Sequence, residues 1–119
     1  MRLLLPLPML LSCIAAACAS PSSDVSKLAC NALESGVLFE VVYHGDKRLV
    51  EVHVVGETKD GIALIRVWQI EGPGDEPEGW RSFHPNEISD ATVREEASNA
   101  PRPDCNPIDA AIVEVDCKV

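Results

Sequence analysis

The sequence predicts a mainly β domain in which one N-terminal helix is followed by a curved antiparallel sheet or small barrel, with the helix over one end. Three observations lead to this α+β prediction. The spacing of apolar residues changes from the helical period to strict alternation after Gly36. Turn-forming residues then separate short runs that are rich in β-branched side chains. With 119 residues, the chain has room for one small domain.

Residues 1–19 are predicted to be a signal peptide that precedes the domain. Arg2 is followed by an apolar run without acidic residues, which ends in small residues and is short for a membrane span. Cleavage before Ser20 would release a secreted protein. The alanines before Cys18 also resemble a bacterial lipobox, which we favour because two acyl chains on Cys18 would anchor the domain firmly through the Ser-rich linker 20–24. We expect an exported protein, periplasmic or a membrane-anchored lipoprotein, or a cytoplasmic one if translation starts downstream.

The predicted domain spans residues 25–119 and begins with a helix over residues 25–35. Apolar residues recur there at helical spacing. Asp24 can cap the N-terminus of this helix, and Gly36 suits its C-terminal stop.

Five or six short strands are expected after the helix. The turn signal at residues 44–47 separates the first two runs, which should form a hairpin. In the second run, alternation places Val50, Val52 and Val54 on one face and Glu51 and His53 on the other. The last run also alternates and should be half buried, whereas residues 94–107 should be irregular. The expected strands are 37–43, 48–55, 62–70, 80–84, 88–93 and 113–119.

Three cysteines lie beyond the signal segment: Cys30, Cys105 and Cys117. In an exported protein, one pair could form a disulfide and leave one free thiol. Cys105 and Cys117 are close in sequence, although spacing alone does not decide the pairing. Cys30 lies on the apolar face of the expected helix, which favours a buried and unreactive thiol.

Charge and motif content argue against several classes of function. The chain has 10 basic and 19 acidic residues and a formal net charge of −9, which disfavours binding to nucleic acid or to anionic lipid by charge. His44, His53 and His84 lack the spacing of metal ligands, and no nucleophile motif is present. We therefore predict no enzymatic activity, no catalytic residues, no metal and no cofactor.

Five residues are candidates for ligand binding. Arg66 lies inside an apolar run, where an unpaired guanidinium would cost several kcal/mol, so it must be paired or line a pocket. Arg81 follows Trp80, and Trp68 is expected across from Trp80 on an adjacent strand. One hypothesis is that Arg66 and Arg81, beside Trp68 and Trp80 and with Arg48 nearby, hold a small anion. The favoured alternative is that the arginines form internal salt bridges with Glu40, Glu51 or the acidic loop 71–79, because the chain has 19 acidic residues.

Several short segments occur in a particular order between residues 25 and 119: Val41–Gly45, Arg48–Glu51, Lys59–Gly61, Trp68-Gln69, Gly79–Phe83, Glu87-Ile88, Pro101–Pro103 and Asn106-Pro107. This order resembles the WYL-domain family, specifically its short stand-alone members. The resemblance implies a strongly bent antiparallel sheet of the SH3-like or Sm-like type and a sensing or regulatory role without catalysis. Ile62-Ala63-Leu64 stands where the family has Trp-Tyr-Leu, and no winged helix is present. Gene regulation therefore does not transfer to this chain.

Together these observations predict a non-enzymatic binding or sensing module, exported and lipid-anchored if Cys18 is acylated. It would bind a small, anionic ligand or an envelope protein on the concave face of its sheet. The alternative is a structural or accessory lipoprotein that acts only by protein–protein contact. The ligand, the partner and the oligomeric state do not follow from the sequence.

Overall fold

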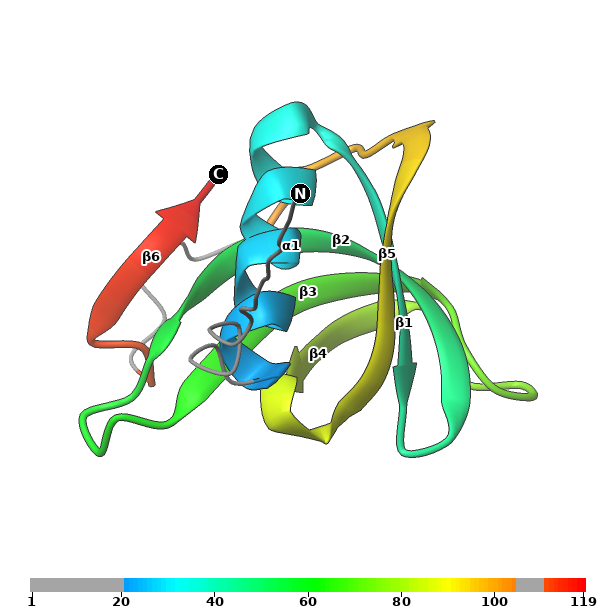
Figure 1. The fold of residues 1–119 in the computed structure, drawn as a ribbon. Coiled ribbons are helices and arrows are strands. Elements are labelled where there is room, and N and C mark those ends of the chain that lie inside the picture. The colour runs from blue at the N-terminus through cyan, green and yellow to red at the C-terminus, as the bar shows by residue number, and fades with distance from the viewer. Residues whose placement is uncertain (1–20, 105–110) are drawn as a thin grey trace, which may run out of the picture.

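The computed structural model describes residues 21–104 and 111–119, in which one α-helix packs on an antiparallel sheet (Figure 1). Strands β1 to β5 form a continuous path in the order β4-β3-β2-β1-β5, and β6 pairs with β2. The elements are α1 (Pro21–Ser35), β1 (Val37–Tyr43), β2 (Asp46–Glu57), β3 (Ala63–Glu71), β4 (Gly79–Phe83), the 3-10 helix η2 (Pro85–Glu87), β5 (Ile88–Ala97) and β6 (Glu114–Lys118).

The predicted helix followed by an antiparallel sheet is confirmed. Within the described residues, however, the sheet is not closed into a barrel, because β4 and β5 end its path and do not pair with each other. The sheet bends around α1, which lies across the concave face rather than over one end (Figure 1). The helix therefore covers part of the concave face, on which the sequence analysis expected a ligand or partner to bind.

Helix α1 begins at Pro21, earlier than expected, and includes residues 21–24 of the predicted linker. Proline has no backbone N–H. It suits the first turn of a helix, because N–H groups there have no partner within the helix. Asp24 lies inside the first turn instead of capping it. The helix ends as predicted at Gly36, which has a positive φ of 68° and donates from its N–H to the Leu33 carbonyl.

The β1–β2 hairpin is tighter than predicted. Its two loop residues, His44 and Gly45, have φ values of 52° and 81°, so both adopt the left-handed conformation that a two-residue hairpin turn requires. Tyr43 pairs with Asp46 directly across this turn. Strand β2 therefore starts at Asp46.

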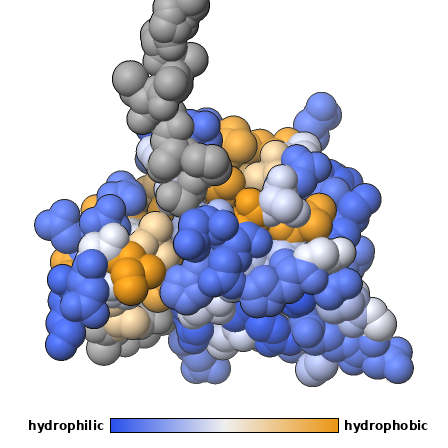
Figure 2. All heavy atoms as spheres, turned by 60° about the horizontal axis from the view of Figure 1, so that its bottom comes forward, coloured by the Kyte–Doolittle hydropathy of each residue, from blue (hydrophilic) through white to orange (hydrophobic). Residues whose placement is uncertain are grey.

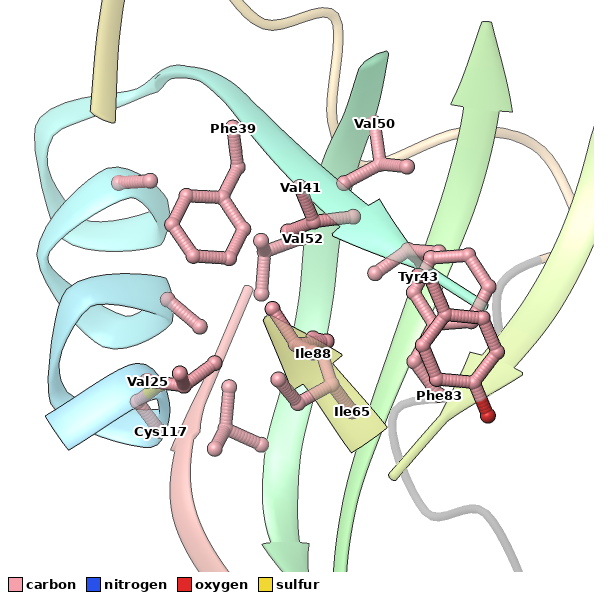
Figure 3. Packing of buried hydrophobic residues seen from close by; sticks show 14 residues of the cluster. Val25, Phe39, Val41, Tyr43, Val50, Val52, Ile65, Phe83, Ile88 and Cys117 are labelled. Carbon is pink, nitrogen blue, oxygen red and sulfur yellow. The ribbon is translucent and has the colours of Figure 1, made fainter. Parts of the chain in front are cut away.

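The main core lies between α1 and the concave face of the sheet (Figure 3). Phe39 and Val41 from β1 and Val50 and Val52 from β2 are at most 2 % exposed. The predicted alternation along β2 fails after Val52, because a register irregularity between Val52 and Val54 adds one residue. Val54 consequently joins a separate cluster with Leu64 and Ile112, and Val55 takes the place in the core.

Strands β5 and β6 also differ from the prediction. β5 continues to Ala97, into the segment that was expected to be irregular. On β6, Cys117 is buried, but Val113 before the strand and Val115 within it are 58 % and 47 % exposed, so the half-buried pattern is wrong. A register irregularity between Val55 and Gly56 in β2 separates the environments of Val115 and Cys117.

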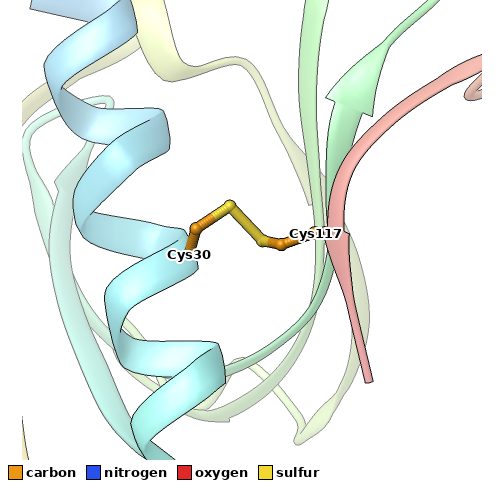
Figure 4. The surroundings of a disulfide bond; sticks show 2 residues. All are labelled: Cys30 and Cys117. Atoms are coloured by element: carbon orange, nitrogen blue, oxygen red, sulfur yellow. A yellow bond between two sulfur atoms is a disulfide. The ribbon is translucent and has the colours of Figure 1, made fainter.

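A disulfide joins Cys30 of α1 to Cys117 of β6 (Figure 4). The expectation that Cys30 is an unreactive buried thiol is therefore wrong. The two cysteines are 87 residues apart in the sequence, but their Cα atoms lie 5.8 Å apart. Sequence spacing gives no sign of this approach. Cys18 and Cys105 lie outside the described residues.

The face brought forward in Figure 2 is mostly hydrophilic, with apolar residues in small separate patches. Apolar residues scattered in this way are normal on a protein surface. In the described part of the chain, no helix is long and apolar enough to cross a membrane.

Candidate functional site

The convex face of the sheet carries a row of stacked aromatic and basic side chains. Trp68 of β3 pairs directly with Trp80 of β4. Arg66 pairs with Ser82 two residues away on the same strands. Because alternate residues of a strand share a face, all four side chains project from the side opposite α1. The two indole rings meet edge to face, with centroids 5.2 Å apart and planes at 86°. This is a favourable geometry for an aromatic pair.

Each tryptophan also carries an arginine over its ring. The guanidinium carbon of Arg66 lies 5.1 Å from the Trp80 centroid, and that of Arg102 lies 5.3 Å from the Trp68 centroid. These four side chains, Arg66, Trp80, Trp68 and Arg102, are called the tryptophan–arginine ladder below. All four are partly exposed. Their cation–π contacts are each worth about 0.5–1 kcal/mol at such sites.

A buried carboxylate fixes one end of the ladder. Glu51 of β2 is 0 % exposed, and it accepts from Arg102 Nε at 2.6 Å and from Arg102 Nη2 at 3.2 Å. The backbone N–H of Asn99 donates to the same carboxylate at 2.6 Å. These bonds hold residues 98–104, which follow β5, against the sheet. They also raise the pKa of Arg102, chiefly through the hydrogen bond to Glu51.

His53 contacts two residues of the ladder, Trp80 and Arg102. Its ring is 0 % exposed and packs edge-on against Trp80, with centroids 4.8 Å apart. Nε2 must accept a hydrogen bond, because its partner at 3.0 Å is the backbone N–H of Arg102. Nδ1 then carries the proton and donates to the Glu51 carbonyl at 3.0 Å. Burial lowers the pKa of His53, so the neutral ring that this bonding requires is the form present at pH 7.

A second polar cluster lies on the concave side, beyond the end of the hydrophobic core. Arg48 of β2 donates from Nη1 to the carboxylate of Glu76 at 2.7 Å and to the side-chain oxygen of Gln69 at 3.1 Å. The Nε of Arg81 lies 3.6 Å from the same Glu76 oxygen. The side-chain amide of Gln69 also donates to this oxygen and is the main cause of a lowered pKa of Glu76.

The five predicted ligand-binding residues thus fall into two groups. Arg66, Trp68 and Trp80 lie together on the convex face, whereas Arg48 and Arg81 lie on the concave side. Arg81 follows Trp80 in β4, so its side chain projects to the opposite face of the sheet. The structure therefore does not place Arg66 and Arg81 around one ligand.

The comparisons with known proteins identify no relative. No family model, curated protein or solved structure matches this chain. Within the residues that the structure describes, no group of three His, Cys, Asp or Glu side chains could hold a metal ion. The two polar clusters are therefore the candidate sites.

Sequence reasoning missed the residues that organise the convex face. The sequence places Glu51 and His53 on the outer face of a strand and offers Glu51 as one of several acidic partners for the arginines. A Glu and a His within a run of valines also indicate buried polar groups that need partners. Arg102 stands in a Pro-rich segment, 51 residues from Glu51. Nothing in the local sequence signals that pairing.

Proposed function

We propose that this protein is an exported, non-enzymatic binding module that holds a partner protein of the cell envelope on its tryptophan–arginine ladder. The observation that carries the proposal is the ladder itself, with four partly exposed, stacked side chains on the face of the sheet that α1 leaves open. Tryptophan and arginine are the residue types that most often dominate the binding energy of protein interfaces.

The ladder is also preorganised for binding. Trp68 and Trp80 are on adjacent, hydrogen-bonded strands, and the Trp68 indole N–H donates to Glu78 at 2.7 Å. Arg102 is oriented by its two bonds to Glu51. Side chains that are already ordered lose little rotamer entropy when a partner binds, which supports tight binding from a small contact area.

The state of the titratable groups supports a binding role over catalysis. Both ring nitrogens of His53 have partners, and the carboxylate of Glu51 accepts from three donors. A general base or nucleophile needs a lone pair directed at a substrate. His53 and Glu51 use theirs to fix the ladder.

Export is proposed from the disulfide together with the signal pattern. Disulfides persist mainly in secreted and periplasmic proteins, and Cys30–Cys117 joins two elements of the domain. The mass of the protein purified from membranes tests this. An acylated Cys18 terminus or a free Ser20 terminus would support export, whereas an uncleaved chain with reduced cysteines would contradict it.

Membership of the WYL-domain family stays a proposal that depends on the order of sequence motifs. The bent antiparallel sheet agrees with it. The open ends of the sheet do not match the closed SH3-like or Sm-like type that the resemblance implies.

A photocrosslinking experiment tests the binding surface. A photoreactive amino acid at Ser82, beside the ladder, should give one discrete crosslinked product in intact cells. The same group at Lys59, in the exposed β2–β3 turn, serves as the control. Trp80→Ala in the Ser82 probe protein should abolish the product while the disulfide and the circular dichroism spectrum are kept. Equal crosslinking from both positions, or a product that persists in Trp80→Ala, would refute a role for the ladder and would favour an accessory lipoprotein that makes contact elsewhere.

A further inference from the structure

The concave cluster has the composition of an anion-binding site. Its donors, Arg48, Gln69 and Arg81, come from three neighbouring strands, β2, β3 and β4. They converge on a single oxygen atom, Oε1 of Glu76. Two guanidinium groups and an amide around one oxygen are a typical arrangement for recognising a carboxylate.

Two of the donors, Arg48 and Gln69, have contacts that do not depend on Glu76. The side chain of Arg48 is only 10 % exposed, and its guanidinium carbon lies 5.7 Å from the ring centroids of both Tyr43 and Phe83. These two rings belong to the hydrophobic core and pack against each other in Figure 3. The Gln69 side-chain oxygen accepts from Arg48 as well. The positive side of the site is therefore part of the rigid sheet.

The acceptor, in contrast, belongs to a surface loop. Glu76 is in the segment 72–78 between β3 and β4, where residues 74–78 are exposed. The loop fits closely over the site, because a Cβ atom at Gly72 would lie 2.3 Å from the Gln69 amide nitrogen. Arg81 also donates to the carbonyl of Pro77. The loop thus supplies the carboxylate of Glu76 and a carbonyl contact for Arg81, whereas Arg48 and Gln69 belong to β2 and β3.

Glu76 leaves the site incompletely satisfied. Arg48 Nε is buried and has no hydrogen-bond partner, and a buried donor without an acceptor is unfavourable by about 1–3 kcal/mol. The contacts of Glu76 with the three donors all use Oε1. Nε lies on the edge of the guanidinium away from Nη1, so Glu76, which binds Nη1, does not reach it.

We propose that Arg48, Gln69 and Arg81 form a binding site for the carboxylate of a small organic acid or peptide C-terminus, and that Glu76 occupies this site in cis. A ligand carboxylate would displace the side chain of Glu76 and release the loop. This site is on the opposite face of the sheet from the ladder, so the proposal does not depend on the proposed function.

Glu76 competes with a free carboxylate for the site, and this competition determines how much its removal should raise the affinity for a ligand. A short loop presents its carboxylate at a local concentration of about millimolar or more, which weakens the apparent affinity for a free ligand. Replacing Glu76 by Gln keeps the size of the side chain and removes the competing charge. We expect Glu76→Gln to bind acetate at least about tenfold more tightly than the wild type. Asp75→Asn, the same change of charge one residue earlier, should leave the affinity at the wild-type value.

The signal of the Arg48 Nε–H group in ¹⁵N NMR spectra provides a local readout. It should shift on addition of acetate and not on addition of chloride at the same ionic strength. Two tripeptides, one with a free C-terminus and one amidated, distinguish a peptide carboxylate from a small acid. If only acetate shifts the signal, the ligand is a small acid; if the free tripeptide competes with acetate, a peptide terminus fits the site.

Several outcomes would overturn the proposal. One is an Arg48 Nε–H signal that does not move with acetate in Glu76→Gln. A second is equal acetate affinity in Glu76→Gln and Asp75→Asn. If Glu76→Gln does not fold, hydrogen exchange of residues 72–78 in the wild type replaces it. Exchange that rises with acetate and not with chloride supports displacement of the loop, and exchange that is unchanged at saturating acetate shows that Glu76 is only a structural latch.

Discussion

The Cys30–Cys117 disulfide should supply a large part of the stability of this domain. It closes a sequence separation of 87 residues, and the chain-entropy model gives about 4.5 kcal/mol at 25 °C for a loop of that length. Small domains have free energies of unfolding of about 5–15 kcal/mol. The double variant Cys30→Ala/Cys117→Ala, in which neither partner leaves a free thiol, should therefore be close to the limit of folding.

Urea unfolding followed by tryptophan fluorescence measures this loss. Reduction of the wild type, which removes the bond without truncating a side chain, should lower the free energy of unfolding by a similar amount. Cys105→Ala is the matched control and should keep the Cys30–Cys117 peptide in a digest analysed by mass spectrometry. A Cys105–Cys117 bridge, with a separation of 117 − 105 = 12, would contribute only about 3 kcal/mol. Recovery of that peptide, or a loss below about 1 kcal/mol on reduction, would refute the assignment.

Three further predictions concern β6, the buried charge and pH. A methyl group at Gly56 would lie 2.1 Å from a carbonyl oxygen of β6, so Gly56→Ala should lower the free energy of unfolding by about 1–3 kcal/mol and speed hydrogen exchange in β6; unchanged exchange would contradict this. Glu51→Gln should cost about 3 kcal/mol in urea unfolding, against less than about 0.5 kcal/mol for the exposed control Glu95→Gln, and equal losses would argue against the buried ion pair. Because burial lowers the pKa of His53 below its ordinary 6.5, the unfolded chain takes up this proton first as the pH falls, so stability should decrease from about pH 6.5 down to the folded pKa. Unfolding curves at several pH values should show this decrease, and His53→Gln should lack it.

The spacing of apolar residues along the sequence was sufficient to predict the helix and the antiparallel strands, because both depend on local patterns. It failed where the backbone departs from regular alternation. The irregularity after Val52 turns Val54 away from the core and brings Val55 into it. Gly56 then allows β6 to approach β2 closely. Both features depend on contacts between segments that are far apart in the sequence.

The division of the site between two faces of the sheet was predictable from the sequence, whereas the partners of its side chains were not. A strand that contains Trp80 and Arg81 must present them on opposite faces, so the separation into two clusters follows from the predicted strands. The partners do not follow. The pairing of Arg102 with Glu51 and the placement of Glu76 over Arg48 both depend on how irregular segments cross the sheet, and composition does not specify those paths.

Residues 72–78 connect the two faces. Glu76 points to the concave cluster, and Glu78, two residues later, accepts from the indole N–H of Trp68 in the ladder. Displacement of Glu76 by a carboxylate would move the segment that also orients Trp68. Linkage is reciprocal, so a partner that fixes the Glu78–Trp68 bond would disfavour release of the loop and weaken carboxylate binding by the same factor. The two clusters, on opposite faces of the sheet, are therefore connected through one short loop.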